Sequence, residues 1–134
     1  MTSLLDDIIT QFGRSLGMED LALRDGGTVV LDMQQMGTLA FELIGERRED
    51  ISVSLTRRVD FDDSRVPAKL MELCHYRNAP LFPIRAALTR AGDLTFAVGM
   101  EAGEFTLPNL NTAVEALIIF HQQSEAFVSP SRIP

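Results

Sequence analysis

The fold of this chain is decided by residues 27–57, GTVVLDMQQMGTLAFELIGERREDISVSLTR. Apolar and polar side chains alternate in three parts of this stretch, 28–33, 38–44 and 51–55. A period of two is typical of β-strands with one face on a core and the other toward water. The breaks between these parts are short, and short connections join antiparallel neighbours. We therefore expect a three-stranded antiparallel meander whose apolar face must be covered by other elements.

A helix is predicted on each side of the meander. Apolar side chains recur at helical spacing over residues 4–16, and Gly17 is suited to end that helix in the left-handed conformation. Residues 67–76 are predicted to form a short second helix, because Pro67 is tolerated in the first turn and Pro80 prevents the helix from continuing.

A second hairpin and a last helix follow. Alternation over residues 84–88 and 94–100, with Gly92 in the turn between them, indicates two more antiparallel strands. Residues 110–127 are predicted to form a helix whose first half is apolar nearly all round, which is typical of a helix buried on more than one side.

These elements predict an α+β fold with the order α-β-β-β-α-β-β-α, in which helices cover an antiparallel sheet. The length of 134 residues suits one domain. We expect that domain to span residues 1–128, with a disordered tail at 129–134.

Composition excludes several classes of function. The chain has 19 acidic and 12 basic residues, a formal net charge of -7, which argues against nucleic acid as a partner. It has no apolar run long enough to cross a membrane, and its first residues lack the basic region of a secretory signal. The single cysteine excludes an internal disulfide and fits a reducing cytosol, so a cytoplasmic location is expected.

Few residues suggest a catalytic or metal-binding site. Cys74 and His75 are adjacent, and neighbours on a helix point about 100° apart, so they do not form a nucleophile–base pair. Cys74 is interpreted as a core or interface residue and His75 as a surface or interface residue. His121 with Glu125 makes too small a set of ligands for a metal, and His121 is expected to be a capping or surface residue near the end of a helix.

The acidic stretch 60–63 invites comparison with a calcium loop. The EF-hand pattern requires Gly at its sixth position and Glu at its twelfth, but Arg65 and Met71 stand there when Asp60 is the first. We interpret the stretch as acidic residues that precede a helix. No cofactor, metal or catalytic residue is predicted, and the chain is not expected to be an enzyme.

What remains is apolar surface in excess of what one core needs. The candidates for binding a partner lie on the first helix and the outer face of the meander, and they are Leu4, Ile8, Phe12, Val30, Ala40 and Ile44. The candidates for a homodimer interface lie on the middle helix and the second hairpin, and they are Leu70, Met71, Leu73, Cys74, Ala87 and Ala97. A short helix is marginal alone, and pairing with its copy would stabilise it. Scattered surface apolar residues, which any protein has, are the alternative.

The whole pattern resembles the class I type III secretion chaperones, the Tir/CesT-like group that escorts effectors in Gram-negative bacteria. The resemblance is carried by Leu4–Leu16, Thr28–Met33, Thr38–Ile44, Ile51–Leu55, Leu70–Asn78, Ile84–Met100 and the last helix. It implies a homodimer without catalytic activity, around which an effector segment wraps in an extended state.

The sequence leads to one main hypothesis and two alternatives. The main one is a type III secretion chaperone that binds the N-terminal region of one or a few effectors and keeps them soluble and competent for secretion. The first alternative is a non-secretory adaptor or regulator of the same fold, similar to YbjN. The second is a small enzyme that uses the acidic stretch 60–63 with a metal.

Overall fold

The computed structural model describes residues 4–18, 27–33, 36–44, 50–61, 64–75 and 82–130. Its elements are α1 (Leu4–Ser15), β1 (Thr28–Asp32), β2 (Thr38–Ile44), β3 (Asp50–Asp60), α2 (Val66–Leu73), β4 (Ile84–Leu88), β5 (Asp93–Met100), the 3₁₀ turn η3 (Ala102–Glu104), α3 (Leu107–Ser124) and β6 (Ser129–Pro130). This order confirms the predicted α+β fold.

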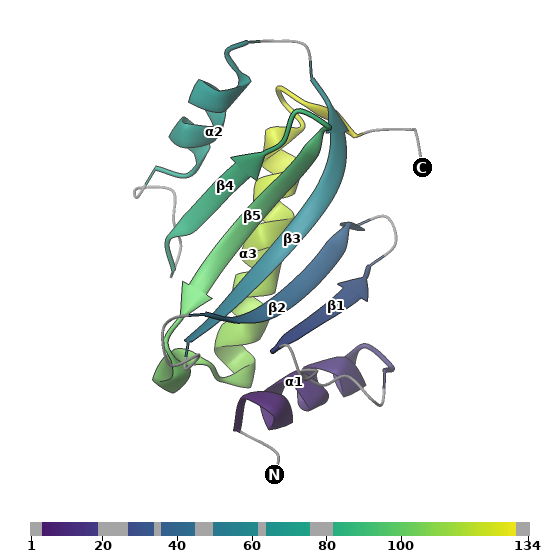
Figure 1. Ribbon diagram of the computed structural model, residues 1–134, viewed down its shortest axis with the longest axis vertical. Helices are drawn as coiled ribbons and strands as arrows, with labels where there is room; N and C mark the ends of the chain where they lie inside the picture. Colours follow the sequence, from purple (N-terminus) through teal and green to yellow (C-terminus); the bar gives the residue numbers. More distant parts are fainter. Residues whose placement is uncertain are drawn as a thin grey trace.

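The strands form one antiparallel sheet in the spatial order β1-β2-β3-β5-β4, with the two-residue β6 paired to the far end of β3 (Figure 1). The meander predicted over residues 27–57 is confirmed, because β1 pairs with β2 and β2 with β3. The second hairpin joins the meander through β5 rather than β4. β1 and β4 are therefore the two edges of the described sheet.

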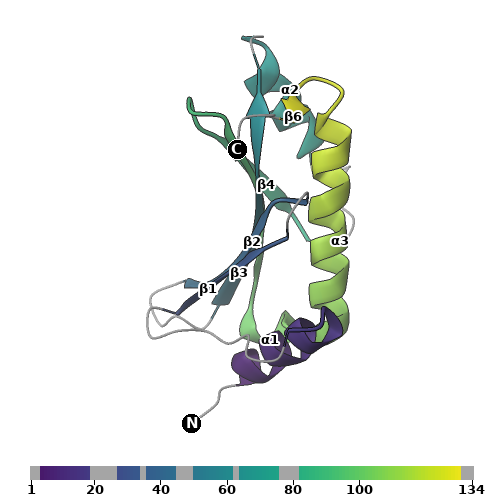
Figure 2. The ribbon, with the colours of Figure 1, turned by 90° about the vertical axis from the view of Figure 1, so that its right-hand side faces the viewer.

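The three helices lie on the same side of the sheet (Figure 2). α3 runs the length of the sheet, α1 packs at one end of it and α2 lies at the other end beside β4. Between them is an apolar core in which Phe41, Phe96 and Phe105 are almost completely buried. The face toward the helices is called the inner face below, and the opposite face the outer face.

Alternation along the strands is confirmed by burial. Val53 of β3 is fully buried on the inner face and stands between Phe41 and Val98 of the neighbouring strands. The next residue, Ser54, stands on the outer face between Ala40 and Ala97, and is only half-buried. The outer face is not covered by any described element.

The end of α1 agrees with its sequence. Gly17 has a φ of +82°, in the left-handed region that favours glycine. The amide of Met18 donates to the carbonyl oxygen of Gly13 at 2.8 Å. The amide of Gly17 donates to the carbonyl oxygen of Arg14 at 3.0 Å. This pair of hydrogen bonds is a Schellman motif, which satisfies carbonyls at the end of the helix.

β3 is longer than its alternation predicted. It continues to Asp60 because Val59 is buried and its amide donates to the carbonyl of Gly92 at 2.7 Å. Within this extension Arg57 breaks the apolar pattern but is half-buried, and its Nε donates to the carbonyl of Met36 at 2.6 Å. A hydrogen-bonded arginine thus faces the inner side at a position where the alternation had predicted the strand to have ended.

The later helices also differ in their bounds. α2 ends at Leu73, and the predicted last residue, Tyr76, lies outside the described residues. α3 begins earlier than predicted, because the hydroxyl of Thr106 caps it by accepting a hydrogen bond from the amide of Asn109 at 3.3 Å. Two residues of the expected tail, Ser129 and Pro130, pair with β3, and residues 131–134 lie outside the described part.

Candidate binding surfaces

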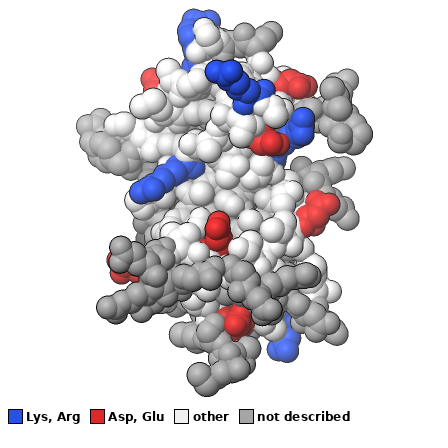
Figure 3. Space-filling model, in the orientation of Figure 1, with Lys and Arg blue, Asp and Glu red and all other residues white. Residues whose placement is uncertain are grey.

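The outer face offers a flat surface of small and apolar side chains. Val30 on the edge strand is 61% exposed, and Ala40 stands beside it on β2. Ile44 is 37% exposed and reaches toward β5, since a Cβ built on Gly99 would lie 3.9 Å from its Cδ1. Seen from this side, the middle of the molecule is largely uncharged (Figure 3). Three of the predicted partner-binding residues therefore lie on one open face.

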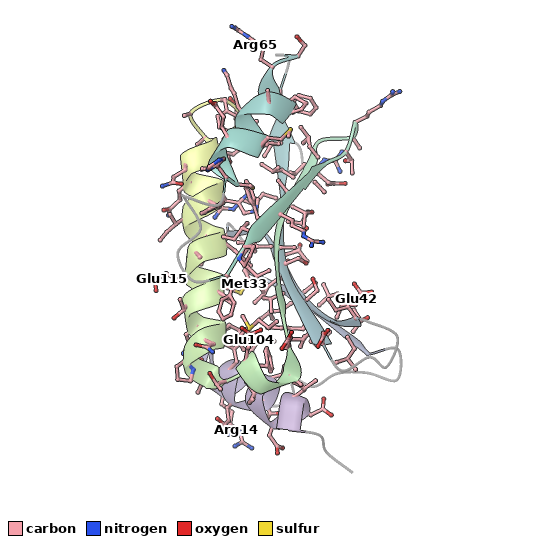
Figure 4. All side chains as sticks on the ribbon, turned by 90° about the vertical axis from the view of Figure 1, so that its left-hand side faces the viewer. Arg14, Met33, Glu42, Arg65, Glu104 and Glu115 are labelled. Carbon is pink, nitrogen blue, oxygen red and sulfur yellow. The ribbon has the colours of Figure 1, made fainter. Side chains whose placement is uncertain are left out.

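Acidic side chains surround this surface on the meander side. Asp32 and Glu42 are exposed on the outer face, and Asp50 stands opposite Ile44. Glu42 points away from α3, on the far side of the sheet (Figure 4). The arrangement can attract a segment that carries basic side chains among apolar ones.

The candidates on α1 do not join this surface. Ile8 is 7% exposed and Phe12 is 3% exposed, because α1 packs on the inner face. The ring of Phe12 meets that of Phe41 edge to face, with centroids 5.8 Å apart. The structure thus places Ile8 and Phe12, which were predicted to bind a partner, in the apolar core and not on the outer face. Leu4 lies in α1, but its side chain is outside the described part.

The candidates for a dimer interface are divided between two faces. Ala87 and Ala97 lie on the outer face, whereas α2 lies on the inner side. Leu70 is 4% exposed and belongs to the core of its own protomer. Met71 is 77% exposed, and Leu73 and Cys74 are half-buried. Leu70 is therefore taken up by the core, and the accessible candidates on α2 and at its C-terminal end are Met71, Leu73 and Cys74.

A groove of about 450 Å³ runs between α2 and the edge strand β4. Its lining is mostly apolar and consists of Phe61, Pro67, Leu70, Met71, Cys74, Ala86, Leu88, Thr89 and Arg90. Ala86 is exposed although it points to the inner side, because α3 covers β3 and β5 rather than β4. We call this hollow the α2–β4 groove.

A second groove of about 500 Å³ lies on the other side of α2, against α3. It is lined by Leu73, Thr112, Glu115, Ala116, Ile119, Phe120 and Gln123, and we call it the α2–α3 groove. The groove was not predicted from the sequence. The residue that could have indicated the groove is Ile119, which is 41% exposed on a helix predicted to be buried on more than one side.

The described titratable groups are spread over the molecule. His121 stands in the last turn of α3, as expected, but it is only 1% exposed, so the expectation that it lies at the surface is wrong. Burial raises the pKa of the Cys74 thiol, which disfavours the reactive thiolate. Within the described ranges, no three His, Cys, Asp or Glu side chains gather at distances that could hold a metal ion. The described helices include none with the length and hydropathy of a membrane span.

Comparisons with known proteins agree with this geometry. Residues 4–125 match the model of a family described as the type III secretory system chaperone SycN. No curated protein sequence matches the chain significantly. Among solved structures, a chain of the ExsC–ExsE complex is 17% identical, with a TM-score of 0.75 and 98% of both chains covered.

Two further structures share the fold. A chain of the HopA1–SchA chaperone–effector complex is 15% identical, with a TM-score of 0.67, and the match covers 90% of this chain and 91% of that one. YbjN from E. coli, a candidate transcription regulator, is also 15% identical, with a TM-score of 0.57 and coverage of 98% and 99%. At these identities the likeness extends to the fold alone.

Proposed function

We propose, from the premise that this chain belongs to the type III secretory system chaperone SycN family, that it binds the N-terminal region of one or a few effectors and keeps them soluble and competent for secretion in the bacterial cytosol. The observation that carries the proposal is the extent of the family match. Residues 4–125 include the whole sheet from β1 to β5 and all three helices. The chain acts by binding and not by catalysis.

The effector segment binds in an extended state on the outer face of the meander. Val30, Ala40 and Ile44 supply apolar contacts there, and the edge of β1 that pairs with no described strand offers main-chain groups for pairing. Asp32 and Glu42 favour Lys or Arg in the bound segment. The solved HopA1–SchA complex supports the proposal because a chaperone of this fold is there described with its effector.

The chaperone is a homodimer, and its copies meet at the α2–β4 groove. Met71 lines this groove with 77% of its surface exposed, so it extends the apolar lining outward to where a second copy could cover it. A two-fold axis beside α2 would place Met71 of each copy in the groove of the other, because such contacts are reciprocal. Ala86 and Leu88 of β4 would be covered at the same time.

The alternative is a regulatory adaptor, and one observation favours it: YbjN shares the fold over 98% of this chain. A regulator would bind a component of the transcription machinery and no secreted protein. The family match over residues 4–125 favours the chaperone.

Co-expression tests the proposal. Tagged wild-type chain is produced together with the product of each neighbouring gene, and the proteins that co-purify are identified by mass spectrometry. We expect a secreted protein to co-purify with the wild type, and at least about tenfold less of it with Ile44→Asp. Arg14→Gln, at an exposed site on α1, is the matched control. Capture of a transcription regulator and of no secreted protein would favour the adaptor.

A further inference from the structure

β1 is an edge strand, and β2 is its single neighbour among the described strands. At the end of β1, the amide of Met33 donates to the carbonyl oxygen of Gly37 at 2.8 Å. The amide of Met36 donates to the carbonyl oxygen of Met33 at 3.2 Å. Both hydrogen bonds lie within the β1–β2 connection. The place of β1 therefore depends on what joins this connection to the rest of the protein.

Arg57 of β3 joins the connection to the sheet. Its Nε donates to the carbonyl oxygen of Met36 at 2.6 Å, across 21 positions of the chain. The stem of Arg57 is also close to the connection, since a Cβ built on Gly37 would lie 2.8 Å from its Cγ. The side chain of Arg57 is only 16% exposed. The β1–β2 connection is thus packed against, and hydrogen-bonded to, one side chain of β3.

The same guanidinium reaches the end of α3. Nη1 of Arg57 lies 3.7 Å from Oε1 of Glu125, the residue that follows the helix. Burial lowers the pKa of the guanidinium, and the charge of Glu125 opposes this shift. The end of α3 is itself fixed, because Val128 is buried and β6 pairs with β3. Arg57 therefore connects the β1–β2 connection to a firmly held part of the molecule.

A guanidinium suits this double contact. Its donors stand in a planar fork and can point at two acceptors at once, whereas an ammonium is a single point charge. An apolar residue at this inward position would pack well but would donate nothing to the carbonyl oxygen of Met36. The arginine thus has a role that packing alone does not supply.

We propose that Arg57 is a positioning residue for the effector edge: by tying the β1–β2 connection to β3 and to the end of α3, it holds β1 where its outer edge accepts the effector segment. This inference rests on the proposed function. Arg57 faces the inner side, so it acts through the position of β1 and not by contact with the effector. A strand that is already held in place loses less conformational entropy when a partner pairs with it.

Three variants separate the contacts of Arg57 from its bulk. Arg57→Met keeps an apolar stem and removes both contacts. Arg57→Lys keeps a charge that can reach one of the two partners but not both. Arg58→Met makes the same exchange at the next position, whose side chain is exposed on the outer face, and is the matched control.

Hydrogen–deuterium exchange measures how firmly β1 is held. We expect exchange in peptides that cover residues 28–33 to be at least about tenfold faster in Arg57→Met than in the wild type, with a smaller effect in Arg57→Lys. Exchange in peptides that cover β5 should change by less than about twofold, and Arg58→Met should match the wild type in both regions. Unchanged exchange over residues 28–33 would overturn the inference. Equal acceleration in β1 and β5 would also overturn it, because Arg57 would then support only the stability of the whole fold.

Affinity for the secreted protein that co-purifies with the wild type is the second measurement. We expect Arg57→Met to bind this protein at least about fivefold more weakly at a temperature where the variant is folded, and Arg57→Lys to recover part of the loss. Unchanged affinity of a folded Arg57→Met would refute the positioning role. If no secreted protein co-purifies with the wild type, the proposed function fails instead, whereas the exchange of β1 tests the hold of Arg57 without any effector. The two failures are therefore distinguishable.

Discussion

Nε2 of His121 lies 2.7 Å from the carbonyl oxygen of Leu55, and this hydrogen bond joins the middle of the sheet to α3. The imidazole is buried, and its ring stands edge to face with that of Phe96 at 4.7 Å between centroids. Nδ1 has no hydrogen-bond partner within the described ranges. Because a carbonyl oxygen only accepts hydrogen bonds, Nε2 must carry a proton, and in the neutral ring Nδ1 is the nitrogen without one.

This environment makes stability depend on pH. Burial lowers the pKa of His121 from 6.5 to about 4, the hydrogen bond to Leu55 opposes the shift, and the charge of Arg57 adds to it. The unfolded chain thus binds a proton between pH 6.5 and 4 that the folded chain does not, and stability falls as pH falls through this window. We expect His121 to contribute a loss of about 1 kcal/mol in the free energy of unfolding between pH 7 and pH 5.5.

Urea unfolding at the two pH values measures this loss. His121→Gln is the control, since an amide can donate to the Leu55 carbonyl but does not titrate. The variant should be less stable than the wild type at pH 7 but lose less stability at pH 5.5. Identical pH dependence in the two proteins would contradict the prediction.

Gly92 is required by the approach of the β4–β5 turn to β3. Its φ is +97°, and a Cβ there would lie 2.5 Å from the carbonyl oxygen of Val59. Gly92→Ala should lower the free energy of unfolding by about 2 kcal/mol or more, because both strain and a backbone clash are introduced. Gly103→Ala is the matched control, since nothing lies within 4 Å of its Cβ, and its effect should stay within about 0.5 kcal/mol. Equal melting temperatures for the two variants would contradict the prediction.

The fold could be predicted from the sequence because apolar and polar side chains alternate along most of the length of the strands. Val53 and Ser54 are assigned to opposite faces by period alone, and burial confirms both. The bounds could not be predicted where long-range contacts determine them. β3 extends to Asp60 because Val59 bonds with Gly92, 33 positions later in the chain. His121 was misjudged for the same reason, since its partner Leu55 lies 66 positions earlier.

The binding surfaces were only partly predictable. Val30, Ala40 and Ile44 are on the outer face because alternation fixes the face of each residue on a strand. For the helices, periodicity predicts which residues form an apolar stripe, but it does not predict which surface that stripe packs against. Ile8 and Phe12 are therefore buried in the core, and Ile119 is partly exposed beside α2.

The proposed dimer predicts the effect of a charge at the most exposed apolar residue of α2. Met71→Glu should give a folded monomer, because it places a carboxylate in the apolar α2–β4 groove. Leu73→Glu should be less informative, since Leu73 is half-buried in its own protomer. Ala68→Gln, at an exposed position of the same helix, is the control and should keep the wild-type mass. Light scattering at micromolar concentration measures the mass of each protein in solution. A wild type that is already monomeric would refute the dimer.

The effector face predicts that changes at Ile44 separate binding from stability. Ile44 is 37% exposed on the outer face, so a polar replacement should leave the melting temperature nearly unchanged. Burying an isoleucine against a partner contributes on the order of 1.5–3 kcal/mol, so affinity for a co-purified effector should fall by at least about tenfold.

The sign of the new charge then reports on the chemistry of the bound segment. Ile44→Lys places a cation opposite Asp50 and reduces the acidity of the face, whereas Ile44→Asp increases it. A basic effector segment should therefore lose more affinity with Lys than with Asp, and most strongly at low salt. Calorimetry measures the affinity of both variants for the effector, and thermal unfolding measures their stability. A destabilised Ile44→Lys protein would show that Ile44 supports the fold, and a greater loss of affinity with Asp would show that the segment is acidic.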